Sequence, residues 1–156
     1  MSQPTLTREG VTVALYTILQ GLPGLVTKSR RLRHWSEVPI LEQPAMFLSA
    51  GNQTQEQDPD GLPCKWHLDF TVHLYNYSED PAVAPSTGIN VLLDALEAAL
   101  DPVQAGAPGW PGSVQVLGDL TGRIRHAWIS GPIETDEGVL GPQAIAIVPI
   151  EVEFHR

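Results

Sequence analysis

The sequence predicts an α/β fold of the α+β type, with a mixed, largely antiparallel sheet of about four to five strands packed against two main helices. Three observations lead to this fold class. Two segments carry apolar residues at helical spacing, one long segment alternates apolar and polar residues, and the C-terminal run is rich in β-branched residues. One-sided burial is typical of antiparallel sheets, so a doubly wound parallel sheet is not expected.

The length and composition indicate one folded domain spanning residues 1–156. Hydrophobic residues make up 42% of the chain and charged residues 17%, which is too apolar for a disordered protein. No run of about 18 apolar residues is present, and the N-terminal MSQPTLTREG has no secretory pattern. We therefore expect a soluble protein made in the cytosol, in which the lone Cys64 forms no internal disulfide.

The first half of the chain predicts one helix, two strands and a loop. Apolar residues recur every three or four positions from Thr7 to Gln20, and Thr7 is a plausible N-cap. After a Gly/Pro stop, Leu25 to Trp35 predicts an extended strand with a basic face, and Ala45 to Ala50 a short strand. The polar stretch Gly51 to Pro63 predicts an exposed, mobile hairpin loop.

The strongest strand pattern runs from Lys65 to Tyr77, where apolar and polar residues alternate at every position as far as Leu74. A second helix is expected from Ser86 or Thr87 to about Leu100. It ends there because Asp101 precedes a proline, which disfavours helical geometry. Its apolar stripe should lie on the sheet.

The C-terminal third predicts a loop and further strands. Pro102 to Gly112 is expected to be the loop, and Ser113 to Leu120 with Gly122 to Ile133 one broken strand or two consecutive ones. The last strand, Gln143 to Phe154, should be buried on both faces where it begins, and Pro149 indicates an edge or a bulge. The predicted order is α-β-β-β-α-β-β.

The charge distribution argues against nucleic acid and for protein partners. A net charge of -9 disfavours phosphate binding, yet Lys28, Arg30, Arg31 and Arg33 fall within six residues. A negative molecule with one basic segment is suited to docking copies of itself or an acidic neighbour. The alternative interpretation is an ordinary solvated strand face.

No pattern predicts a metal, a cofactor or catalysis. His67 and His73 lie six residues apart on one strand, hence about 20 Å apart, which is too far for one ion. The cluster Glu134, Asp136 and Glu137 lacks the regular oxygen ligands of a calcium loop. It could also be a catalytic carboxylate pair, but no pocket or general-acid partner can be inferred for it.

Aromatic and charged residues indicate an interface instead. Trp35 directly follows the basic segment, and tryptophan with arginine is enriched where proteins meet, whereas Trp66 and Trp128 fit a core position better. The predicted interface residues, taken from charge and aromatic placement, are Arg30, Arg31, Arg33, Trp35, His67, His73, Glu134, Asp136 and Glu137.

Four segments together resemble the tail-terminator proteins of long-tailed phages and related prophages, also described as minor tail or tail-completion proteins. These are TKSRRLRHWSEVP, QPAMFLSAG, INVLLDALEAALDP and AWISGPIETDEGVLGPQAIAIVPIEVEF. The resemblance implies a hexameric ring in the virion that caps the tail tube, with the major tail tube protein and the head-completion (neck) protein as partners. It also implies synthesis in the bacterial host cytoplasm and carries no catalytic residues.

Two other classes stay open. One is another head-to-tail connector or neck subunit. The other is a small-ligand-binding or enzymatic domain, which would need a concave pocket with converging polar groups. Neither sequence-specific nucleic acid nor a membrane is expected as a partner.

Overall fold

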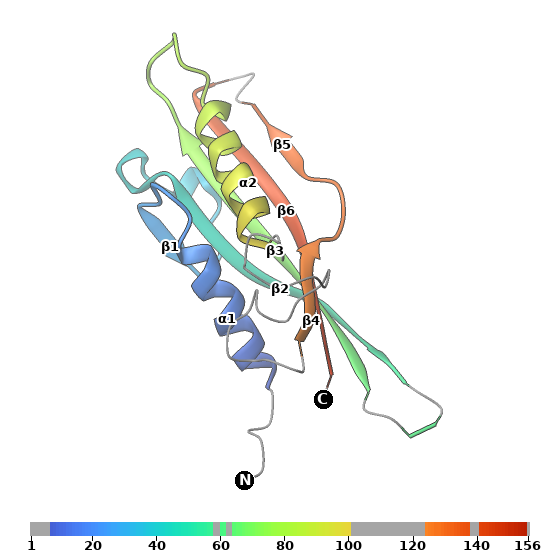
Figure 1. Cartoon of the computed structure of the whole chain (residues 1–156). Helices are drawn as coiled ribbons and strands as arrows, with labels where there is room; N and C mark the ends of the chain where they lie inside the picture. The colour runs from blue at the N-terminus through green and yellow to red at the C-terminus, as the bar shows by residue number, and fades with distance from the viewer. Residues whose placement is uncertain (1–6, 58–59, 62–63, 101–123, 138–140, 156) are drawn as a thin grey trace.

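A computed structural model describes residues 7–57, 60–61, 64–100, 124–137 and 141–155, and in this part of the chain two α-helices lie on one face of a six-stranded sheet (Figure 1). The strand order is β1-β2-β3-β6-β4, and β5 also pairs with β6. Only β1 and β2 pair in parallel. The predicted α+β class with a mixed, largely antiparallel sheet is confirmed. The strands are β1 (Thr27–Ser29), β2 (Ala45–Glu56), β3 (Lys65–Tyr77), β4 (Ile124–Ile129), β5 (Glu134–Asp136) and β6 (Gln143–His155).

Both helices agree with the sequence prediction. The first, α1 (Arg8–Gln20), begins where the Thr7 hydroxyl accepts a 2.9 Å hydrogen bond from the backbone N–H of Gly10. The second, α2 (Ser86–Leu100), buries the stripe that its 3.6-residue spacing predicts. Its buried residues are Ile89, Leu92, Leu96 and Leu100.

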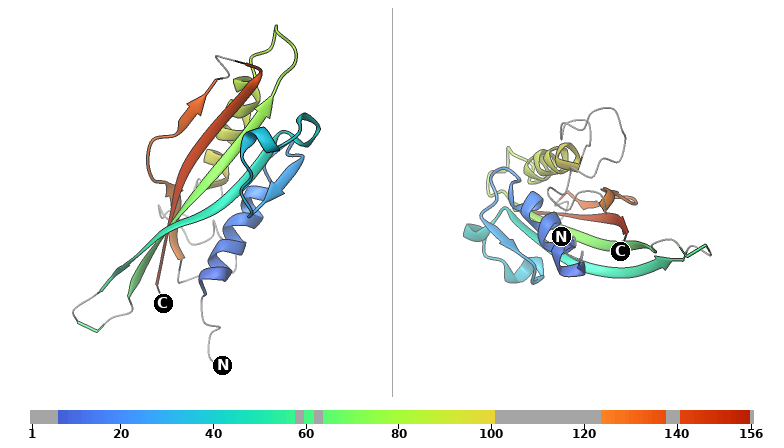
Figure 2. Two further views of the ribbon diagram at one scale, coloured as in Figure 1. Left: turned by 180° about the vertical axis from the view of Figure 1, so that it is seen from behind. Right: turned by 60° about the horizontal axis from the view of Figure 1, so that its bottom comes forward.

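The main core lies between the two helices and one face of the sheet. Both helices cover the same side (Figure 2), and their apolar stripes belong to one cluster with the inward residues of β2, β3 and β6. The β3 contribution is Leu68, Phe70, Val72 and Leu74, as the alternating pattern predicts. The opposite face carries a smaller cluster of Val38, Ala45, Phe47 and Tyr75. Two 3-10 turns, η1 (Trp35–Glu37) and η2 (Ile40–Glu42), flank Val38 on that side.

The predicted basic strand is wrong over most of its length. Only β1 is extended, and residues 30–34 are irregular before η1 begins. Local side-chain bonds favour this conformation, because the Ser29 hydroxyl accepts the Arg31 N–H at 3.0 Å and the His34 ring accepts the Ser36 N–H at 3.3 Å. Arg31 and Arg33 therefore do not share one face of a strand.

The polar segment after Ala50 is also not a loop throughout. Residues 51–56 continue β2 and pair with the start of β3, which also pairs with the end of β6, so they form an exposed arm along the edge of the sheet. Two residues, Gly51 and Asn52, stand opposite Asp69, which makes a β-bulge at the base of this arm. Backbone pairing needs no apolar side chains, so a polar composition does not exclude a strand.

The C-terminal strands differ from the prediction in two respects. Of the segment predicted from Gly122 to Ile133, only Ile124–Ile129 form a strand, β4, whereas residues 130–133 are irregular and the unpredicted β5 follows them. The predicted Pro102 to Gly112 loop and Ser113 to Leu120 strand lie outside the described residues. On β6 only one face is fully buried, since Ile145 and Ile147 are half-buried.

Pro149 lies in a central strand rather than at an edge. Pro149 lies between the part of β6 that pairs with β4 and the part that pairs with β5. The Ser130 N–H donates a 3.0 Å hydrogen bond to the Pro149 carbonyl oxygen, so the side of Pro149 that lacks an N–H faces this gap. A central strand thus tolerates the proline without losing a bond to β3.

Candidate interaction surfaces

Two of the predicted interface arginines form ion pairs within the chain. Arg30 makes a two-pronged contact with Glu9 of α1, which includes a 3.0 Å bond from Nη2 to Oε2. The hydrogen bonds from Arg30 lower the pKa of Glu9. Arg33 binds Glu42 of η2 at 2.8 Å and lies over the Phe47 ring, 5.6 Å from its centroid. These two arginines connect the irregular segment to the fold.

The other two cations of the basic segment, Lys28 and Arg31, are not engaged in such pairs within the described residues. Both are exposed. Arg31 is the second residue after β1, and β1 is an edge strand of the described sheet. Lys28 and Arg31 are therefore the cations of this segment that a partner could reach without breaking an internal pair.

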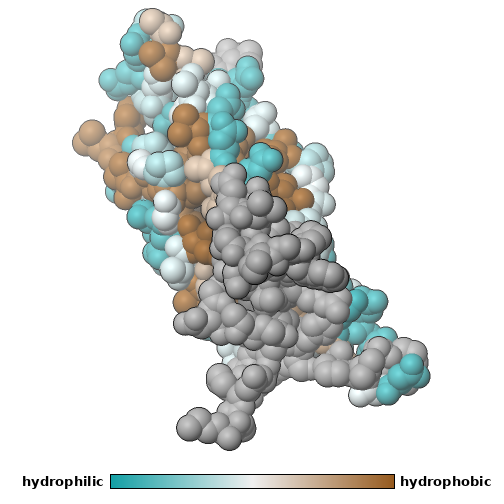
Figure 3. Space-filling view, viewed as in Figure 1, coloured by the Kyte–Doolittle hydropathy of each residue, from teal (hydrophilic) through white to brown (hydrophobic). Residues whose placement is uncertain are grey.

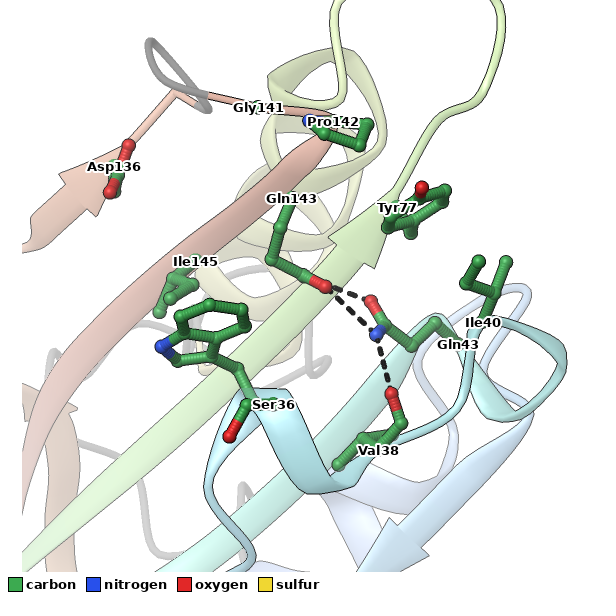
Figure 4. Close-up of a pocket in the computed structure, with 11 residues that line it drawn as sticks. Ser36, Val38, Ile40, Gln43, Tyr77, Asp136, Gly141, Pro142, Gln143 and Ile145 are labelled. Atoms are coloured by element: carbon green, nitrogen blue, oxygen red, sulfur yellow. Dashed lines mark hydrogen bonds between the residues drawn. The ribbon is translucent and has the colours of Figure 1, made fainter.

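A pocket of about 630 Å³ opens on the sheet face opposite the helices. One wall is the segment with the two 3-10 turns, which contributes Trp35, Val38 and Ile40, and the other is the start of β6 with Asp136 of β5 (Figure 4). Trp35 remains 41% exposed at this wall. The pocket therefore brings together two predicted interface residues, Trp35 and Asp136, from distant parts of the chain.

Part of the polar lining of this pocket is a pair of amides that sequence reasoning did not find. The side chains of Gln43 and Gln143 exchange two hydrogen bonds of 2.9 Å, drawn in Figure 4. Gln43 also donates to the Val38 carbonyl oxygen, and Gln143 to that of Asn76. Each amide N–H₂ is thus used inside the chain, so the pair fixes the pocket wall. No local pattern marks either residue.

The acidic cluster lies at the other edge of the sheet from the basic segment. Glu134 and Asp136 belong to β5, which pairs only with β6 in the described sheet, and Glu137 follows it. All three residues are exposed. The structure therefore separates the acidic and the basic predicted residues within one chain, at opposite edges of the sheet.

The two predicted histidines share the open sheet face but not their surroundings. His67 is 2.6 Å from Glu151 and 3.4 Å from Glu56. Burial alone lowers the pKa of His67, but the hydrogen bonds to Glu151 and Glu56 outweigh it and raise the pKa. His73 is half-buried, its Nδ1 has no hydrogen-bond partner among the described residues, and burial lowers its pKa. The two histidines therefore do not belong to one site.

Exposed apolar side chains gather near β1 and the 3-10 turns. Leu41 is 91% exposed, and Val26, Leu32 and Ile40 are exposed as well. Figure 3 shows hydrophobic residues on this side of the molecule, at its upper left. An apolar surface beside exposed cations is a composition that protein interfaces use. Trp66 and Trp128, predicted as core, are only half-buried, and Arg8 stacks on Trp66 at 4.4 Å from the ring centroid.

Other kinds of site have little support in the described residues. Among them, no group of three or more His, Cys, Asp or Glu side chains is arranged to hold a metal ion. None of the helices in this part of the chain is both long and apolar enough to span a bilayer.

No protein-family model and no curated protein matches the chain. Among solved structures it is similar to a chain from the virion of a native gene transfer agent particle, with a TM-score of 0.54 and 14% sequence identity. The match covers 97% of this chain and all of that chain, 100% of its length. The two chains thus share a fold over nearly their whole length.

Proposed function

We propose that this chain is a non-enzymatic structural subunit of a phage-type virion, and specifically a tail terminator that acts in a homo-oligomeric ring. The observation that carries the proposal is the end-to-end likeness of its fold to a chain of a gene transfer agent virion. A likeness that covers nearly all of this chain and all of the other favours a common kind of assembly unit rather than a shared fragment.

The four-segment resemblance to tail terminators supports the finer assignment. In this role the subunit forms a hexameric ring at the end of the tail tube, on the major tail tube protein, and joins it to the head-completion protein in the neck. The exposed arm of residues 51–56 and the apolar surface around Leu41 are suited to these contacts, because neither is buried within the chain.

Particle morphology tests the assignment. Deleting the gene should give tails of uneven or excess length without heads, because an uncapped tube continues to add subunits. A plasmid copy of the gene should restore uniform tails. Native mass spectrometry of the purified protein reports the number of subunits in the ring. Normal particles in the deletion strain contradict the proposal.

A connector or neck subunit is the nearest alternative, and the same micrographs separate the two. Loss of a connector leaves heads and tails of normal length that fail to join. Loss of a terminator changes the tails themselves.

The pocket favours a second class of function, the binding of a small ligand. It combines apolar walls with the Asp136 carboxylate, which suits a small organic cation. A thermal-shift screen with amines checks this, with Asp136→Asn as the variant that should abolish any shift. A tail terminator with an empty pocket gives no shift for any amine.

A further inference from the structure

In the described part of the chain, β1 and β5 each pair with only one strand, and these two edges lie at the same level of the sheet. Lys28 pairs with Met46, Met46 with Leu74, Leu74 with Ala146, and Ala146 with Thr135. These residues form one row across five strands, with Lys28 on β1 at one end and Thr135 on β5 at the other. Figure 1 shows β1 and β5 on opposite sides of the molecule.

The backbone groups of the two end residues point away from the sheet. Thr27 donates its N–H to the Pro44 carbonyl oxygen at 3.4 Å, so in the alternation of a strand the N–H and C=O of Lys28 face outward. On β6 the Pro149 carbonyl faces β4, hence Ile147 and Ile145 face β5 and bond to Glu134 and Asp136. Thr135, which lies between them, also presents its N–H and C=O to the outside.

The directions and charges of the two edges are complementary. β1 is parallel to β2, and the pairings of β2 with β3, β3 with β6 and β6 with β5 are antiparallel. The edge strands β1 and β5 therefore run in opposite directions. The β1 edge carries the exposed cations Lys28 and Arg31, which form no ion pair among the described residues, and the β5 edge carries the exposed Glu134 and Glu137. Four strand spacings, about 19 Å, separate the edges in one chain, so they cannot meet each other within it.

We propose that β5 of one copy pairs antiparallel with β1 of the next copy, so that the sheets continue from subunit to subunit around the ring. This inference rests on the proposed ring and names its contact. The interface is heterologous, since two different edges meet, and such an interface closes into a ring when its rotation divides a full turn. Open strand edges are ready templates for another chain, and opposite charges on the two edges select the correct partner edge.

A charge-exchange experiment tests the contact. Lys28→Glu with Arg31→Glu makes both edges acidic, and Glu134→Lys with Glu137→Lys makes both basic. Each variant alone should dissociate at concentrations where the wild type is assembled, with at least about a tenfold rise in the dissociation constant. An equimolar mixture of the two should assemble again, and so should one chain carrying all four changes. Asp94→Lys with Glu97→Lys on the exposed face of α2 changes the net charge as much as the basic variant and should assemble normally.

A backbone variant tests the strand pairing itself. Thr135→Pro removes the outward N–H without removing a bond to β6, whereas Thr135→Ala keeps the N–H. The proline variant should weaken assembly and the alanine variant should not. Sedimentation gives the assembly state, and circular-dichroism melting checks that each variant is folded.

Two failures are distinguishable. If the wild type forms rings and all the folded variants form them equally well, the edge pairing is overturned and the ring stays in place. A wild type that is monomeric both in solution and by cross-linking within purified particles overturns the ring and the edge pairing together.

Discussion

The side-chain amides of Gln43 and Gln143 bond to each other twice, although the residues lie 100 positions apart in the chain. Gln43 lies just before Pro44, which leads into β2, and Gln143 is the first residue of β6. The pair therefore joins the segment of 3-10 turns to β6, a central strand of the sheet. Their bonds to the Val38 and Asn76 carbonyl oxygens extend this connection.

Replacing Gln143 should therefore destabilise the fold. Gln143→Ala removes the bonds to Gln43 and Asn76 and leaves part-buried polar groups unsatisfied, so we expect a loss of about 1–3 kcal/mol in the free energy of unfolding. Urea denaturation measures it. Gln55→Ala on the exposed arm is the matched control and should change stability by less than about 0.5 kcal/mol. Equal effects of the two variants would show that the amide pair contributes nothing.

The elements with local patterns were predictable. The strand Lys65–Tyr77 and the helix that ends at Leu100 agree with their predicted bounds, because alternation and helical spacing are properties of the segment alone. The strand prediction for the basic segment is wrong because the composition allows a strand there, whereas the side-chain bonds at Ser29 and His34 that interrupt it depend on conformation.

The sequence predicts individual residues of the candidate site but not how they are arranged. Trp35 and Asp136 were both expected at an interface, but their meeting in one pocket depends on the pairing of β5 with β6. Likewise, the placement of the basic and acidic segments at opposite sheet edges follows from strand order. Strand order is set by contacts between distant segments, which no local pattern records.

The structure separates the arginines that were expected to act together. Arg33→Ala should lower stability by about 1 kcal/mol, because it removes the half-exposed pair with Glu42 and the contact with Phe47. Arg31→Ala should leave stability within about 0.5 kcal/mol and weaken assembly instead. Thermal melting and sedimentation of both variants check this assignment. A stability loss at Arg31 that matches the loss at Arg33 would place Arg31 in the fold.

The His67 pair with Glu151 predicts a pH dependence of stability. Because the folded-state pKa of His67 is raised above its usual value near 6.5, its contribution is present below about pH 6.5 and is lost as the pH rises through the folded value. The stability gap between wild type and His67→Gln should be larger at pH 5.5 than at pH 8.5. Urea midpoints at both values measure the gap.

His73 provides a control of opposite sign for this experiment. Burial lowers its pKa, so its contribution is present above about pH 6.5 and is lost as the pH falls through the folded value. The gap between wild type and His73→Gln should shrink from pH 8.5 to pH 5.5. Gaps that move in the same direction for both variants would contradict these assignments.

The arm formed by residues 51–56 of β2 should open more readily than the rest of the sheet. Its β2 residues are exposed, and only one strand pairs with them, whereas residues 70–74 of β3 pair on both sides and cover the core. Backbone amides at Gln53–Glu56 should exchange with deuterium at least tenfold faster than those at Phe70 and Val72 in the free protein. In assembled tails the arm amides should slow markedly, as expected for a segment that packs on a neighbour. Arm amides already as protected as Val72 in the free monomer, or unchanged on assembly, would exclude such a role.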